Sequence, residues 1–150
     1  MRRQPGNVGE TTVATASNVS FENPKGSSPV LGLYSHVGTV KGGNLHFIAG
    51  QVAIEASGEL VGKDDFDQQF SRVFASLGSI LHELGGDYTS IAKLTTYLVH
   101  SQDIAKFMKC RETLFPKIFP GGKYPPNTLL IIGRLVKEEF LIEVEAMAAI

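Results

Sequence analysis

Two carboxylates near the end of the chain, Glu143 and Glu145, have a spacing that could serve acid–base chemistry. They lie in the alternating segment 141–148, which predicts a β-strand, and residues two apart in a strand point to the same face. Two carboxylates on a sheet face that must itself be buried are costly unless they line a wet cleft or find partners. Glu143 is therefore a candidate general base, and a solvated or ion-paired place at the sheet rim is the alternative.

Asn127, which follows the turn from Tyr124 to Pro126, is a candidate for ligand binding. Its side chain offers two N–H donors and one carbonyl acceptor, which suits an amide, a carbonyl or a hydroxyl group better than a free carboxylate. Asn is also a common turn residue, so service to the turn is an equally good explanation. Arg134 or Lys123 could supply a cation from elsewhere in the fold.

The number and spacing of the cysteine, histidine and glycine residues argue against a disulfide, a metal site and a phosphate loop. Cys110 is the only cysteine, so no intrachain disulfide is expected, and an inert thiol is favoured over a nucleophile. The four histidines are dispersed without metal-ligand spacing, and we expect neither a metal nor a cofactor. The segment 58–64 has the wrong spacing for a phosphate loop and lacks its Ser or Thr.

Composition indicates one soluble domain of 150 residues, with 43% hydrophobic residues and a net charge of −1. Scattered Lys and Arg argue against nucleic acid or a membrane surface as the main partner. No apolar run reaches membrane length, and a cytoplasmic location is expected. Residues 1–29 are polar and predict a flexible N-terminal tail, followed by a folded domain at 30–150.

The helices that must position these residues follow from hydrophobic periodicity. Apolar residues at steps of three and four between 66 and 84 predict an amphipathic helix, with Asp64 or Asp65 as N-cap and Gly85-Gly86 as its end. The seven residues of this apolar stripe are Phe66, Phe70, Val73, Phe74, Leu77, Leu81 and Leu84. A second helix is expected to start near 101–103.

Strands are expected at 34–40, 45–49, 59–61, 91–99, 128–135 and 140–150, with hairpins joining the first two and the last two. This order predicts an α+β fold: a single mixed β-sheet with two helices packed on one face. Nothing in the chain covers the second sheet face, although the segment 129–132 is apolar on both sides. Self-association would bury that face.

Five short segments occur in an order that is typical of one family: Ala49-Gly50-Gln51, Lys93 to Thr96, Tyr124-Pro125, Arg134-Leu135 and Glu143 to Ala146. With them, the chain from residue 30 to its end resembles the RidA/YjgF superfamily, the reactive-intermediate deaminases also described as L-PSP endoribonucleases. The resemblance implies a homotrimer with small-molecule sites in the clefts between subunits.

The resemblance also implies roles for single residues. Glu143 would position the attacking water, with Glu145 as the fallback because the last turn has one residue more than the family pattern. Tyr34 would line the cleft, Gly50 would allow a close backbone approach, and Gln51 could bond across the subunit boundary.

Three positions depart from the family. Asn127 stands where deaminating members have an arginine that clamps the substrate carboxylate, and Arg134 is the first candidate for a replacement cation. Ala49 and Leu129 stand where the family has a serine and a cysteine.

Three functions remain open at this point. The first is a RidA-like imine or enamine deaminase with atypical substrate specificity, and the second is a trimer that binds a metabolite without turnover. The third is an endoribonuclease, which the neutral charge balance disfavours.

Overall fold

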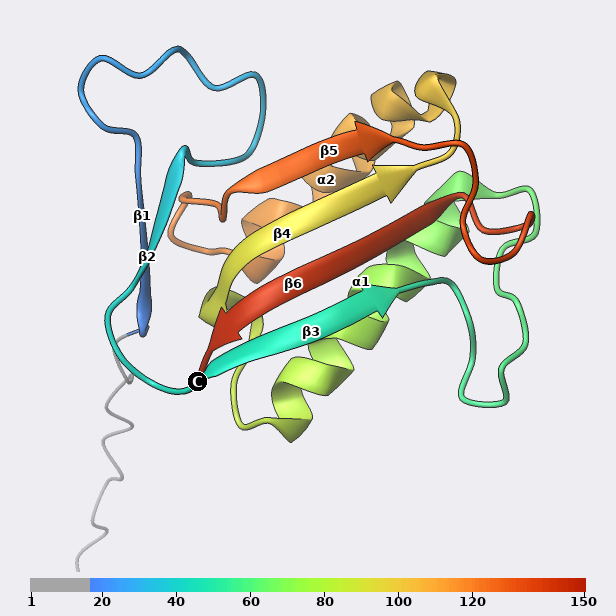
Figure 1. Ribbon diagram of the computed structural model, residues 1–150, viewed down its shortest axis with the longest axis horizontal. Helices are drawn as coiled ribbons and strands as arrows, with labels where there is room; N and C mark the ends of the chain where they lie inside the picture. Colours follow the sequence, from blue (N-terminus) through green and yellow to red (C-terminus); the bar gives the residue numbers. More distant parts are fainter. Residues whose placement is uncertain (1–16) are drawn as a thin grey trace, which may run out of the picture.

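The computed structural model describes residues 17–150 and has one mixed four-stranded sheet with two helices on one face (Figure 1). The strand order is β3-β6-β4-β5; β4 and β5 are parallel, and the other neighbours are antiparallel. The strands are β3 (Leu45–Gln51), β4 (Ile91–Leu98), β5 (Asn127–Ile131) and β6 (Ile142–Ala149), and the helices are α1 (Phe66–Glu83) and α2 (Ile104–Ile118). The expected α+β architecture is confirmed.

Helix α1 begins and ends where its sequence signals indicate. The Asp65 carboxylate accepts a hydrogen bond from the backbone N–H of Gln68, and Gly85 adopts a left-handed φ of 87° that ends the helix. Of the seven stripe residues, Leu84 alone is exposed, because it lies at the C-cap after the last helical turn.

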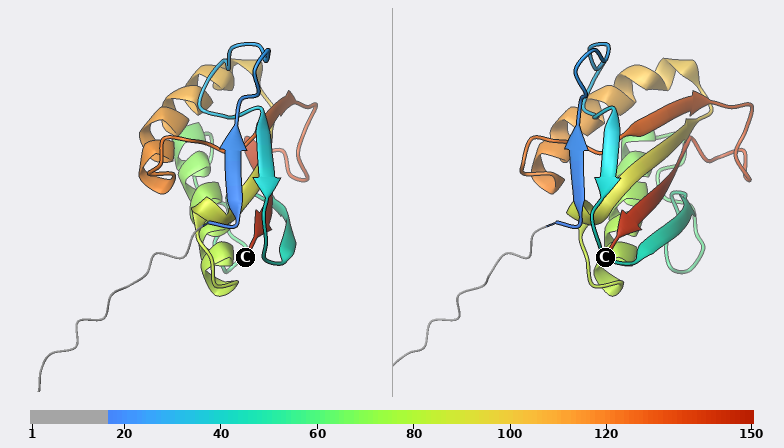
Figure 2. Two further views of the ribbon diagram at one scale, coloured as in Figure 1. Left: turned by 90° about the vertical axis from the view of Figure 1, so that its left-hand side faces the viewer. Right: turned by 60° about the vertical axis from the view of Figure 1, so that its left-hand side comes forward.

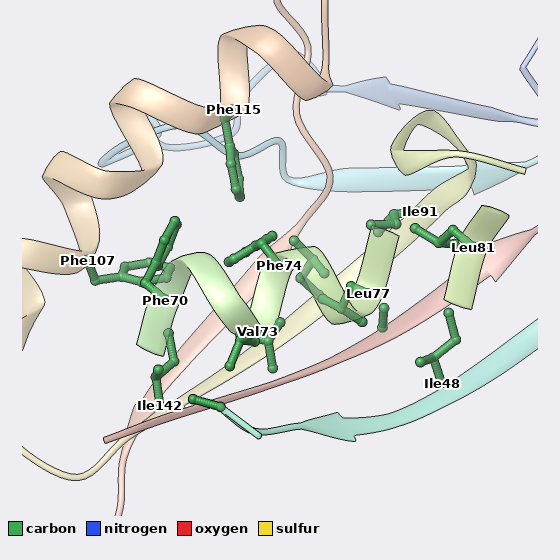
Figure 3. Close-up of a cluster of buried hydrophobic side chains, with 14 of the residues drawn as sticks. Ile48, Phe70, Val73, Phe74, Leu77, Leu81, Ile91, Phe107, Phe115 and Ile142 are labelled. Atoms are coloured by element: carbon green, nitrogen blue, oxygen red, sulfur yellow. The ribbon is translucent and has the colours of Figure 1, made fainter. Parts of the chain in front are cut away.

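The hydrophobic core lies between the helices and one face of the sheet (Figure 3). Side chains from α1 occupy its centre, Phe107 and Phe115 of α2 lie beside them, and the sheet contributes Ile48, Ile91 and Ile142. The Phe70 ring contacts Phe74 at 4.7 Å and Phe107 at 5.9 Å between centroids, so aromatic packing joins the two helices.

Neither expected hairpin forms. Strand β2 (Val37–Val40) pairs with β1 (Val19–Glu22) in a separate two-stranded sheet, and the Gly42-Gly43 turn carries the chain from this sheet into the main one. Strand β6 lies between β3 and β4, so it does not pair with β5. Strand β5 lies at the edge of the sheet and pairs in parallel with β4. The loop after β5 then leads the chain past β4 to the start of β6.

The expected tail, residues 1–29, is corrected in part. Strand β1 falls inside that range, and its Val19 is buried against Ala92 and Ala149 of the main sheet. Figure 2 shows the β1–β2 ribbon beside the end of the main sheet where the C-terminus lies. Residues 1–16 of the expected tail lie outside the described residues. The expected strand at 59–61 is reduced to a single bridge between Ile54 and Leu60.

A buried glutamine, Gln69, fixes the start of β6. Its Nε2 donates to the carbonyls of Gly62 (3.0 Å) and Glu139 (2.8 Å), and its Oε1 accepts from the N–H of Leu141 at 2.8 Å. These bonds tie α1 to the loop that ends two residues before Glu143. The side chain is fully buried. The Gly62 carbonyl also accepts from the N–H of Asp65 at 3.0 Å, so Gln69 matters most to the Glu139 carbonyl and the Leu141 N–H.

Replacing Gln69 by alanine should lower the free energy of unfolding by about 1–3 kcal/mol, because the Glu139 carbonyl and the Leu141 N–H lose the hydrogen bonds that this buried side chain supplies. Urea denaturation of Gln69→Ala and of the exposed control Gln68→Ala would measure it. The control should lose much less. Equal losses in the two variants would show that the buried bonds do not stabilise the fold.

Candidate active site

Glu143 and Glu145 lie on the open face of the sheet, away from the helices. Their neighbours Ile142 and Val144 are fully buried under the helices, so the carboxylates point to the other side. Across the β4–β6 ladder, Glu143 is opposite Tyr97 and Glu145 is opposite Thr95. The strand phase expected from the sequence is therefore confirmed.

The Glu143 carboxyl lies directly against the backbone of Gly50. A Cβ atom at Gly50 would overlap Glu143 Oε1 and would lie 2.6 Å from Cδ and 2.8 Å from Cγ. Only glycine leaves this space open. The contact occurs between Ile48 and Gln51, where the register of the β3–β6 ladder shifts. The structure thus brings together Glu143 and Gly50, two residues that the sequence singled out.

The surroundings of Glu143 favour its protonated form. Burial raises the pKa of this carboxyl, and the negative charge of Glu145 raises it further. The Tyr97 hydroxyl donates a hydrogen bond to Glu145 Oε1 at 3.2 Å. Burial is the main cause that raises the pKa of Tyr97, and the negative charge of Glu145 is the second. Among residues 17–150, Glu143 has no basic side chain within 4.0 Å. Its charge is therefore not neutralised within the protomer, as suits a general base.

Asn127 lies on the opposite face of the same sheet. It opens β5 opposite Leu94, and its Oδ1 accepts a hydrogen bond from Thr96 Oγ1 at 3.1 Å. Leu94 and Thr96 are fully buried on the helix side, so the Asn127 carboxamide lies there too. Its Nδ2 is buried and has no hydrogen-bond partner among the described residues. One protomer therefore does not bring Asn127 to Glu143.

The remaining candidates are held locally. Tyr34 lies in the loop between β1 and β2, where its hydroxyl accepts from the N–H of Leu31 at 3.3 Å. Gln51 donates from Nε2 to the carbonyl of Ala49 in its own strand at 3.0 Å. Arg134 is engaged in its own loop by an ion pair with Glu138 at 2.9 Å. This pairing gives no support to Arg134 as the replacement cation.

Comparisons with known proteins show the family to which the chain belongs. The profile of the family described as Endoribonuclease L-PSP matches residues 26–150. The chain belongs to the RidA/YjgF family. A RutC family protein of Pyrococcus abyssi is 35% identical over 119 residues, which are 79% of this chain and 87% of that protein. The chloroplastic Reactive Intermediate Deaminase A of Arabidopsis thaliana is 29% identical over 139 residues, covering 91% of this chain and 70% of the relative.

A solved structure supports the same assignment. A protein of unknown function of the Rid family from Yersinia pestis superimposes with a TM-score of 0.79 at 32% identity, covering 89% of this chain and 99% of that one. The RidA/YjgF fold thus extends over nearly the whole described part of this chain.

One further polar residue of this RidA/YjgF chain escaped the sequence analysis. Arg111 lies on α2 and is 3% exposed, and its guanidinium carbon lies 5.1 Å from the Phe107 ring centroid and 5.7 Å from that of Phe115. Residues 107, 111 and 115 are four apart and share one helix face. A charged residue in the middle of an apolar helical stripe was the signal that could have found it.

Cys110 belongs to a different part of the surface. It lines a groove of about 420 Å³ between α1 and α2, together with Asp67 and Lys109. Burial, followed by a hydrogen bond to Asp67, raises the pKa of the Cys110 thiol to about 11. The thiol is therefore protonated at neutral pH, which agrees with an inert role. None of the candidate site residues lines this groove.

Neither a metal-binding cluster nor a membrane-spanning helix is found among the described residues. Across 17–150, no group of three His, Cys, Asp or Glu side chains is arranged to hold a metal ion. Over the same range, no helix combines the length and the apolar character of a membrane span.

Proposed function

We propose that this protein hydrolyses a small imine or enamine and releases ammonia. The observation that carries the proposal is the Glu143 carboxyl, which lies against Gly50 on the open sheet face with a raised pKa and without a counter-ion in the protomer. The likeness to the Arabidopsis deaminase supports the same reaction class.

Glu143 would act first as a base and then as an acid. Its carboxylate takes a proton from water while the oxygen adds to the imine carbon, and the C=N electron pair moves to nitrogen. The protonated Glu143 gives its proton to that nitrogen, which yields a neutral carbinolamine. The Glu143 carboxylate then takes the hydroxyl proton and passes it to the amine nitrogen as the C–N bond breaks, so ammonia leaves as a carbonyl forms. One imine and one water give one carbonyl compound and one ammonia.

The site would be completed between copies of the chain. The open sheet face exposes four large apolar side chains, which would be costly to leave in water: Leu45, Phe47, Leu130 and Met147. Glu143 and Asn127 lie on opposite sheet faces, so a ligand that touches both must bridge two protomers. A homotrimer with a small molecule in each inter-subunit cleft satisfies both requirements.

The proposed activity should depend on pH through Glu143. As the base it must be ionised, so kcat/KM should rise with pH through a pKa above the ordinary value of 4.5. Glu145→Gln removes a negative neighbour, which makes ionisation of Glu143 easier and should move this acidic limb to lower pH. A kcat/KM profile whose limb stays in place or moves upward in Glu145→Gln would contradict the coupling.

The direct test is ammonia release from imines that an amino-acid oxidase generates in the same cuvette. The protein should accelerate release above the rate of spontaneous hydrolysis. If imines from a range of amino acids show no acceleration, the deaminase proposal fails. Ligand binding without turnover would then favour a metabolite-binding trimer, in line with the missing arginine at position 127.

A further inference from the structure

Two buried side-chain nitrogens among the described residues have no hydrogen-bond partner: Nε of Arg111 and Nδ2 of Asn127. Both are donors, so both lack an acceptor. Within residues 17–150, no carboxylate lies within 4.0 Å of the Arg111 guanidinium. A buried cation without a counter-ion lowers the stability of the fold.

The guanidinium is held in place without being neutralised. It lies on the rings of Phe107 and Phe115, and its Nη2 donates to Met108 Sδ at 3.2 Å. On another side it lies against Gly32, where a Cβ atom would overlap Nη2 and would lie 3.6 Å from Cζ. Aromatic faces and a glycine backbone orient the planar guanidinium, but they supply few acceptors for its N–H donors.

Two further residues relate Arg111 to the candidate residues Tyr34 and Asn127 on the helix-covered side of the sheet. Burial lowers the pKa of Arg111, whereas the hydroxyl of Tyr34, two residues after Gly32, and the carboxylate of Glu112, which lies more than 4.0 Å away, both raise it. The ring of Tyr124, three residues before Asn127, lies 6.0 Å from the Phe115 ring on which Arg111 stacks. Arg111 and Asn127 therefore belong to the same helix-covered edge of the sheet, at β4, β5 and α2.

We propose that Arg111 and Asn127 form a subsite for a planar anion, the carboxylate of the substrate. The permanent cation would come from α2, and Asn127 would add a neutral N–H donor. The substrate class is then an imine or enamine that carries a carboxylate, in contrast to the uncharged ligand that Asn127 by itself suggests. The identity of the substrate rests on the proposed function, whereas binding of the anion does not require turnover.

A purely structural role for Arg111 makes a different prediction about stability. If the guanidinium stabilises the core by stacking on Phe107 and Phe115, Arg111→Met should lower the melting temperature. If it serves to bind an anion, Arg111→Met keeps the apolar stem, removes a buried unpaired charge, and should melt at the same temperature or higher. Thermal unfolding of the two proteins without ligand separates these roles.

The binding test uses pyruvate as the carboxylate probe and pyruvamide as its uncharged counterpart. Calorimetric titration of the wild-type protein should detect pyruvate and not pyruvamide. Arg111→Met should raise the Kd for pyruvate at least about tenfold, because it removes a charge-assisted pair. Arg72→Met, an arginine on α1 that pairs with Glu55 at 3.5 Å, is the matched control and should bind pyruvate like the wild type.

Equal pyruvate affinity in wild type and Arg111→Met would overturn the subsite, as would a wild-type protein that does not prefer pyruvate to pyruvamide. Failure of the proposed function has another signature. In that case pyruvate binds in an Arg111-dependent manner, but no imine releases ammonia faster than in buffer.

Discussion

Gly50→Ala should lower kcat/KM for ammonia release by about 100-fold or more while the protein stays folded. The added methyl group would occupy the space of the Glu143 carboxyl, whose Cδ and Cγ lie 2.6 and 2.8 Å from it. These two atoms and Oε1, which overlaps as well, belong to the flexible Glu143 side chain. The carboxylate can therefore move away without unfolding the sheet. A displacement of about 1 Å at a catalytic group can cost about 100-fold in rate.

Gly121→Ala is the control for this prediction. Gly121 has no atom within 4 Å of an added Cβ, and its φ is not in the left-handed region. The control should keep its activity, and circular dichroism should show both variants folded. If Gly50→Ala turned over substrate at the wild-type rate, the contact between Gly50 and Glu143 would have no part in catalysis.

Phe47→Asp should dissociate the assembly and abolish activity. Phe47 is 72% exposed in the protomer and pairs across the β3–β6 ladder with Met147, on the same face as Glu143. If three copies bury this face against each other, a carboxylate there would be desolvated without a partner. Light scattering should then report the mass of one chain, whereas the wild type should give the mass of three.

Val136→Asp separates this effect from a general response to added charge. Val136 is 76% exposed, nearly the same as Phe47, but it lies in the loop after β5 and not on the open sheet face. It should leave the mass and the activity unchanged. A Phe47→Asp protein that still has the mass of three chains would show that the open face is not the interface.

The sequence predicted those parts of the fold that local patterns determine. The steps of three and four from Phe66 to Leu81 define α1, and Asp65 and Gly85 mark its two ends. Alternation correctly placed β4 and the phase of β6, and therefore the face on which Glu143 lies. In these segments burial follows directly from sequence spacing.

Strand pairing was harder to predict, because it depends on contacts between distant segments. The insertion of β6 between β3 and β4 is set by ladders on both of its sides, and no local signal in the last two strands opposes a hairpin. Strand β1 was missed because its four residues, Val19–Glu22, follow a polar stretch. Its partner β2 was assigned to the nearer strand instead.

The candidate site was predicted in the same uneven way. Glu143 and Gly50 come from two strands that pair directly, and the sequence marked both. Arg111 was missed because its neighbours Phe107 and Phe115 define a core-facing stripe, and the arginine between them was not considered. The hydrogen bond from Tyr97 to Glu145 depends on the β4–β6 register. It was not predicted, because the last strand was expected to pair with β5 and not with β4.

The most direct test of the account is the rate of ammonia release by Glu143→Gln beside the wild type, with the same imine at the same pH. Because the folded pKa of Glu143 lies above its unfolded value, its ionisation costs stability as the pH rises through that pKa. The neutral glutamine should therefore not unfold the protein at pH 7.

Glu143→Gln should lower kcat/KM by at least about 100-fold, the contribution of a positioned general base, and should keep the same assembly mass. Glu83→Gln, an exposed change at the end of α1, should have no effect. Ammonia release by folded Glu143→Gln at the wild-type rate would contradict the central claim that this carboxylate activates the water.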